Sequence, residues 1–257
     1  MFHSKLLSQV DFIEHAFFGR EGGVSTGNFA SLNFSLNVGD VEQNVIKNRD
    51  IIANKFQINS ENIVVLKQVH SNRVLWVNNN ICNSEGDGLI LSRDSPIDNK
   101  LAIGVVTADC LPVLFVDKKL QIISAVHAGW RGLLEGILEN TILEFMKKNS
   151  LVSNLLVAIG PSIRKESYEV DESFYGAFFS KDSSSASFFT STQHNKFLFD
   201  FTGYAVYKLK NLGLSLSQID VLPNNTYLEE DNFFSHRRSC HKNEASRGLQ
   251  LSVILLK

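Results

Sequence analysis

Two histidines and one cysteine have side chains of the types that bind transition metals, and each stands beside a short apolar run. His70 and Cys110 follow such runs, and His127 lies between a third run and the glycine-rich segment 128–132. Two imidazoles and a thiolate suit zinc, and three protein ligands leave a fourth position for water or substrate. Side chains at strand ends are held by a rigid sheet and still reach a surface. The three residues therefore predict a catalytic metal centre.

The spacing alone leaves other interpretations open. The three residues are far apart in the sequence, and no local metal-binding pattern joins them. A buried cysteine often packs as a small apolar side chain, and a histidine is often an ordinary core or surface residue. Alternatively, Cys110 is a nucleophile and His127 its base, which would make the protein a metal-free hydrolase or amidase.

Charged residues stand next to the candidate ligands. Asp109 could act as an acid, a base or a partner of a ligand, but neighbouring strand residues face opposite sides, so this role requires a bulge or turn. Arg131 stands at the start of a predicted helix, where its guanidinium and the backbone N–H groups could hold phosphate. An exposed arginine that binds no ligand would look identical in the sequence. The run His-Arg-Arg at 236–238 is either a further basic cluster or a solvated face.

The elements that position these residues follow from the apolar periodicity. Short β-rich runs predict strands at 12–18, 63–66, 73–77, 101–106, 112–116, 121–126, 155–159, 197–199, 219–222 and 249–256. Helical spacing predicts helices at 42–56, at 204–212, and after Gly132 with Lys147 and Lys148 near the end. The serine-rich stretch 180–192 is predicted to be a surface loop. Without regular βαβ alternation, this order predicts an α+β or layered sandwich with mixed sheets.

Composition and charge limit the class of protein and its partners. Of the 257 residues, 44% are apolar and 20% charged, as in folded proteins. The formal net charge is −2 and basic residues are spread thinly, which argues against nucleic acid or a membrane surface as a partner. No apolar stretch has transmembrane length and the N-terminus is unlike a secretory signal, so we expect a cytoplasmic protein. Three cysteines (Cys82, Cys110 and Cys240), without a C-x-x-C pair, argue against a disulfide framework.

Motifs along the chain resemble the YfiH-type, or laccase-domain, family of purine nucleoside phosphorylases. The main ones are KQVH at 67–70, TADCLPV at 107–113, VHAGWRG at 126–132 and IGP at 159–161. Similarity extends over nearly the whole chain through FGREGGVS at 18–25, SLN at 31–33, GD at 39–40, YEV at 168–170 and FFSHRR at 233–238. The resemblance implies one domain over residues 1–257, with an α+β fold layered as an α/β/β/α sandwich of mixed sheets.

The same resemblance implies a function and a ligand set. It places the metal on His70, Cys110 and His127, with zinc expected and copper as the alternative. It implies phosphorolysis of adenosine, inosine, guanosine or methylthioadenosine, and deamination of adenosine, in a monomer or homodimer. For phosphorolysis, Arg131 and Arg20 are candidates to position phosphate. Asn33 is expected to bind substrate, and Asp109 and Arg131 to be catalytic.

Two departures from the family pattern and two competing functions remain. Asn225-Thr226 stands where a Cys-Thr pair is expected, and His236 stands where an aromatic residue is expected; both are expected to affect substrate fit. The laccase label of the family suggests a copper-dependent polyphenol oxidase. Seven histidines in the whole chain are few for an electron-transfer copper plus an oxygen-reducing copper cluster. A module that binds nucleosides without product formation is the non-enzymatic alternative.

Overall fold

Two mixed β-sheets form the centre of the computed structural model, which describes residues 1–78, 81, 84–95 and 100–257. The smaller sheet has the order β1-β13-β5-β2, with strands Ile13–Phe17, Gln250–Leu256, Ala102–Thr107 and Ile63–Val64. The larger has the order β12-β8-β6-β7-β4-β3, with strands Ile219–Val221, Leu155–Ile159, Leu111–Asp117, Ile122–Ala128, Gly88–Ser92 and Val74–Trp76. Parallel pairs are β2 with β5, β3 with β4, and β8 with β12, and the other pairs are antiparallel. Cys82 lies outside the described residues.

Strand β6 shows how one strand joins two layers. Because successive side chains of a strand point to opposite faces, Leu114 and Val116 pack toward the smaller sheet while Val113 and Phe115 pack toward the helices. All four side chains are fully buried. A strand covered on both faces is apolar at every position, which explains the continuous apolar run in the sequence.

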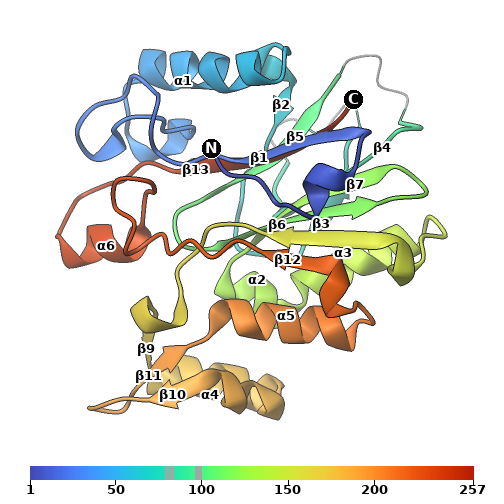
Figure 1. Ribbon diagram of the computed structural model, residues 1–257. Coiled ribbons are helices and arrows are strands. Elements are labelled where there is room, and N and C mark those ends of the chain that lie inside the picture. Colours follow the sequence, from blue (N-terminus) through green and yellow to red (C-terminus); the bar gives the residue numbers. More distant parts are fainter. Residues whose placement is uncertain (79–80, 82–83, 96–99) are drawn as a thin grey trace.

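Helices cover the two outer faces (Figure 1). Helix α1 (Glu42–Lys55) packs on the outer face of the smaller sheet. Helices α2 (Trp130–Glu135), α3 (Ile137–Met146) and α5 (Phe201–Asn211) pack on the outer face of the larger one. The predicted α/β/β/α sandwich with mixed sheets is therefore confirmed. The helix predicted after Gly132 is two helices, because Gly136 takes a left-handed conformation (φ 93°) that ends α2.

A third, antiparallel sheet was not predicted. It has the order β10-β11-β9, with strands Phe189–Ser191, Lys196–Phe199 and Glu169–Asp171, and it lies with α4 (Glu172–Lys181) beyond α5 (Figure 1). The stretch 180–192 contains a 3-10 helix (Ser183–Phe188) and β10, so the prediction of a loop was wrong. Phe189 stacks on Phe199 with ring centroids 4.4 Å apart, in the antiparallel pair of β10 and β11. The serine-rich composition of this stretch gives no signal of that pairing.

Two further elements near the site were also missed. Strand β4 begins at Gly88, two positions after Gly86. Helix α6 (His236–His241) has only 6 residues, too few for an apolar period. Among the described residues, no helix has the length and apolar character needed to cross a bilayer.

Candidate metal centre

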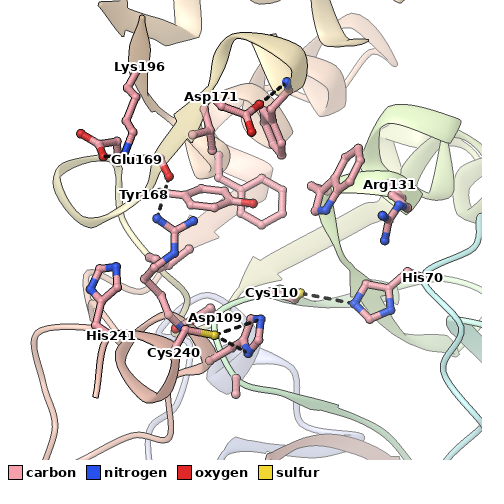
Figure 2. A pocket seen from close by; sticks show the side chains of 18 residues that line it. His70, Asp109, Cys110, Arg131, Tyr168, Glu169, Asp171, Lys196, Cys240 and His241 are labelled. Atoms are coloured by element: carbon pink, nitrogen blue, oxygen red, sulfur yellow. Dashed lines mark hydrogen bonds and ion pairs between the residues drawn. The ribbon is translucent and has the colours of Figure 1, made fainter. Parts of the chain in front are cut away.

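Three segments bring the predicted ligands together at one end of the central strands of the larger sheet. His127 lies on β7, Cys110 lies in the turn just before β6, and His70 lies in the loop between β2 and β3. Strands β6 and β7 are antiparallel neighbours with Pro112 opposite His127, so the turn holds Cys110 beside the end of β7. One ligand atom from each of the three residues lies within 4.8 Å of the others. The structure therefore forms the triad, with 4.0 Å between Cys110 Sγ and His70 Nε2 (Figure 2).

Asp87, which the sequence reading missed, ties the two histidines together. Its Oδ1 accepts from His127 Nδ1 at 2.8 Å and from the backbone N–H of His70 at 3.0 Å, while its Oδ2 accepts from the N–H and hydroxyl of Ser71. The side chain is fully buried. A carboxylate on Nδ1 fixes the histidine tautomer and leaves Nε2 as the ligand atom. The signal available in the sequence was an aspartate between two glycines, Gly86 and Gly88, before a buried strand.

The backbone around the triad is shaped to leave space between the ligands. His70 (φ 58°) and Asp109 (φ 90°) both have left-handed backbone conformations. Residues other than glycine rarely adopt these conformations, and those that do cluster at functional sites. A Cβ on Gly129 would lie 2.6 Å from His70 Cδ2 and 3.5 Å from Cys110 Sγ, so only glycine fits there. This space, with two imidazoles and a thiol around it, fits a tetrahedral metal ion with one open position.

The electrostatics of the triad favour a thiolate. Burial would raise the pKa of Cys110, but the charge and hydrogen bond of His127 and the contacts of His70 outweigh it and lower the pKa to about 6. Burial would likewise lower the pKa of His127, but the Cys110 thiolate and Asp87 raise it to about 9. The thiolate is the form that binds metals and acts as a nucleophile.

Two of the triad residues, His70 and Cys110, border a cavity of about 610 Å³ (Figure 2). Its walls combine aromatic and charged side chains. The aromatic ones are Trp130, Tyr168, Phe174 and Phe201, and the charged or polar ones are Asp109, Arg131, Glu169, Asp171, Lys196, His236, Arg237, Cys240 and His241. Flat rings with a few polar groups are typical of sites for planar organic ligands.

Comparison with known proteins decides the family. The family model described as multi-copper polyphenol oxidoreductase laccase matches residues 14–257. The chain belongs to this family. Relatives have a different name: the purine nucleoside phosphorylase of Rickettsia conorii is 33% identical over 235 residues, 91% of this chain and 92% of that protein. The purine nucleoside phosphorylase YfiH of Escherichia coli is 35% identical, over 85% of this chain and 86% of its own.

Solved structures of similar sequence share the fold of this laccase-family chain. A protein from Neisseria meningitidis is 31% identical with a TM-score of 0.84 and covers 96% of this chain and 95% of its own. YlmD from Geobacillus stearothermophilus is 26% identical with a TM-score of 0.85 and covers 96% and 93%.

In this family member, Asp109 lies in the turn between β5 and β6 that its predicted role required. Its carboxylate is buried and accepts three hydrogen bonds, from Thr226 Oγ1 at 2.7 Å, Ser235 Oγ at 3.0 Å and the Arg237 N–H at 2.7 Å. These contacts give Asp109 a positioning role between Cys110 and the C-terminal segment, and its catalytic role stays a prediction.

Arg131 lies at the start of a helix as predicted, at the second residue of α2, and it borders the cavity. Its guanidinium lies 4.5 Å over the ring of Trp130, and the side chain is exposed. Within the described part of the chain it has no hydrogen-bond or ion-pair partner. Arg131 is therefore free to meet an anion at the cavity mouth.

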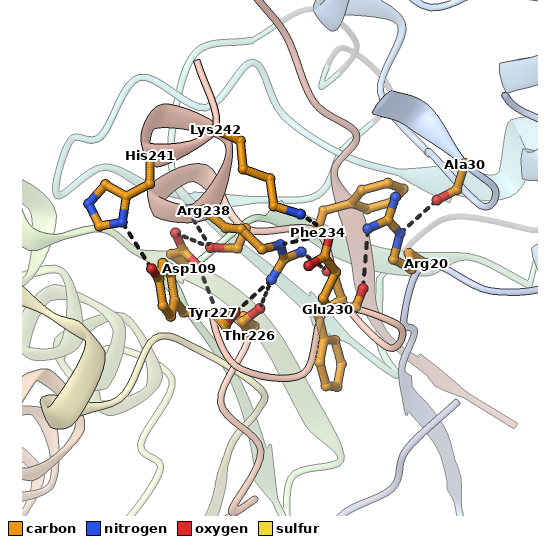
Figure 3. A network of polar contacts seen from close by, with 12 residues as sticks. Arg20, Ala30, Asp109, Thr226, Tyr227, Glu230, Phe234, Arg238, His241 and Lys242 are labelled. Atoms are coloured by element: carbon orange, nitrogen blue, oxygen red, sulfur yellow. Dashed lines mark hydrogen bonds and ion pairs between the residues drawn. The ribbon is translucent and has the colours of Figure 1, made fainter. Parts of the chain in front are cut away.

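The two residues predicted to bind substrate do not border this cavity. Arg20 donates from Nε to the Ala30 carbonyl at 2.7 Å and stacks over Phe234 (Figure 3). Asn33 is fully buried, and its amide bonds to Ser35, Asp40 and the Leu249 N–H. These contacts hold the N-terminal loops against the C-terminal segment, and the substrate-binding role of both residues stays a prediction.

The basic run 236–238 divides between two environments. His236 and Arg237 border the cavity, whereas Arg238 is buried and donates to the carbonyls of Thr226, Tyr227 and Phe233 (Figure 3). Burial and the nearby Arg247 lower the pKa of His236, which favours a neutral ring at neutral pH. Of the two departures from the family pattern, His236 is the one that borders the cavity. Asn225 instead donates to Glu166 and Ser167.

Proposed function

We propose that this protein is a zinc-dependent purine nucleoside phosphorylase with His70, Cys110 and His127 as the metal ligands. The observation that carries the proposal is the triad itself, oriented by Asp87 at the border of a cavity with aromatic and charged walls. The names of its relatives supply the reaction class. The proposed substrates are adenosine, inosine, guanosine and methylthioadenosine with phosphate, and adenosine deamination is a second activity.

Each group of the chain has a role in this proposal. A bound zinc ion would supply a Lewis acid beside the substrate. The rings of Trp130, Tyr168 and Phe174 would stack on the purine and exclude water, while Arg131 attracts phosphate to the mouth. A phosphate oxygen bonds to C1′ of the ribose as the C1′–N9 bond breaks. The electron pair leaves with the base, which takes up a proton from water.

A copper-dependent polyphenol oxidase is the second candidate, favoured by the printed description of the family model. A His₂Cys set binds copper as well as zinc. Oxygen reduction by a multi-copper enzyme needs further copper sites, and among the described residues only one group of three or more His, Cys, Asp or Glu side chains could hold a metal. This distribution of ligands favours the phosphorylase.

Separation of the products formed from adenosine, with and without phosphate, tests the proposal. We expect adenine and ribose 1-phosphate only when phosphate is present, and inosine in both reactions from deamination. Adenine release independent of phosphate would mean hydrolysis and would contradict the proposal. Oxidation of a phenolic substrate in proportion to bound copper, without purine products, would establish the oxidase instead.

A further inference from the structure

Arg237 is held in one orientation at the wall of the cavity by three contacts. Its backbone N–H donates to Asp109 Oδ2 at 2.7 Å, and its Nη1 donates to the Glu169 carbonyl at 2.6 Å. Its guanidinium also lies 5.2 Å from the ring centre of Tyr168. An arginine fixed in this way loses little conformational entropy when a ligand binds.

On this side of the cavity, among the described residues, the guanidinium of Arg237 carries a positive charge without an ion-pair partner. The Lys196 ammonium pairs with Glu169 at 3.0 Å. The carboxylate of Asp171 accepts from Ser173 Oγ and from the N–H of Phe174, so it caps α4. In the described part of the chain, Nε and Nη2 of Arg237 have no hydrogen-bond partner. These donors remain for a ligand in the cavity.

The two arginines of the cavity differ in position and in constraint. In Figure 2, Arg131 lies on one side of the cavity, and Glu169, which bonds Arg237, lies on the other with Lys196 and His241. Arg131 is exposed and contacts Trp130, whereas Arg237 is half-buried and anchored on three sides. A mobile charge attracts an anion, but a fixed planar guanidinium also orients it through paired hydrogen bonds.

We propose that Arg237 binds and orients the phosphate that attacks the nucleoside. This inference rests on the proposed phosphorylase function and assigns its anion subsite to the wall formed by β9 and α6. Asp109 is then a positioning residue, since the same carboxylate fixes the Arg237 backbone next to Cys110. The ligand chemistry is a tetrahedral oxyanion, either inorganic phosphate or the 5′-phosphate of a nucleotide.

The metal-loaded enzyme with Arg237→Gln and Arg237→Lys tests this assignment. Arg49→Gln is the matched control, because Arg49 also stacks on a ring (Phe34, 4.5 Å) and bonds a carbonyl, but it does not border the cavity. We expect Arg237→Gln to raise both the KM and the Kd for phosphate by roughly 10–100-fold. The KM for adenosine should change by less than about twofold, and lysine should recover part of the loss. The control should match the wild type.

Two measurements separate this inference from the proposed function. Phosphorus NMR titration reports phosphate binding without turnover, and product analysis reports the reaction. If phosphate binds through Arg237 but no base is released, the subsite stands and the proposed reaction fails. The subsite is refuted if base is released and the KM for phosphate is independent of Arg237. It is also refuted if the KM values for phosphate and adenosine rise together with a loss of thermal stability. Binding of adenosine 5′-monophosphate through Arg237 without binding of inorganic phosphate would also overturn it.

Discussion

The metal triad and the facing wall of the cavity are built in different ways. Two of the triad residues sit at the ends of β6 and β7, with His127 2% exposed and hydrogen-bonded to a fully buried carboxylate. The third, His70, is exposed in the loop between β2 and β3, but the same carboxylate accepts from its backbone N–H. The facing wall comes from the short elements β9 and α6, where His236 and Cys240 are exposed. A sheet in a packed core fixes its side chains more tightly than short surface elements do. We therefore expect substitutions in the triad to abolish function and substitutions in the wall to tune it.

Removal of a triad ligand should have the largest effect. Cys110→Ala and His127→Ala should each lose the metal and lower phosphorolysis by roughly 1,000-fold or more. The fold should survive, because the site lies at the edge of a large core that does not depend on it. Elemental analysis, activity and circular dichroism measure the three outcomes. Unfolded variants would indicate a structural metal site instead.

Removal of the charge that orients the triad should have the next largest effect. Asp87→Asn should weaken metal binding by about 10–100-fold, because an amide lacks the negative charge beside His127, and its NH₂ group cannot accept from the N–H and hydroxyl of Ser71 as Oδ2 does. Competition with a chromophoric chelator measures this affinity. Asp94→Asn is the control, since Asp94 is exposed and follows the same strand, β4. Equal affinities for the two variants would show that Asp87 does not support the metal.

The pH dependence of metal binding should follow the two shifted groups. With pKa values of about 6 for Cys110 and about 9 for His127, the metal-free protein holds a thiolate and an imidazolium between these limits. Metal binding must then displace the His127 proton, so affinity should fall about tenfold per pH unit from pH 9 to 6. Below pH 6 the thiol is also protonated, and the fall should steepen by a further factor of about ten per unit. The difference in thiolate absorbance between the wild type and Cys110→Ser, followed against pH, reports the titration of Cys110. A midpoint near the ordinary thiol pKa would contradict this prediction.

Substitution of the exposed arginine at the cavity mouth should have the smallest effect. Arg131→Ala should raise the KM for phosphate by roughly 2–5-fold, because it removes an attracting charge and no fixed contact. Adenosine deamination should be impaired less, since that reaction uses no phosphate. Steady-state kinetics of both reactions provide the comparison. Equal losses in the two activities would show that Arg131 does not act on phosphate.

The same contrast explains which features the sequence predicted. Strands β6 and β7 were predicted almost to their ends, because strands buried on both faces leave continuous apolar runs. The three candidate ligands were identified from their types and from the family motifs. Asp87 escaped notice because its partners lie on distant segments, and for Arg237 the sequence predicts either a basic cluster or a solvated face. Only tertiary packing separates Arg237 in the cavity from Arg238 in the interior, since adjacent arginines have no local signal that distinguishes them.

Reconstitution of the metal-free protein tests the central claim most directly. Zinc is added in steps to the chelator-treated protein, and bound metal and phosphate-dependent release of adenine from adenosine are measured at each step. The account predicts that both rise together and saturate at about one zinc ion per chain, with no gain in Cys110→Ala. Full activity in the protein without metal would contradict the account and would support metal-free chemistry at Cys110 and His127.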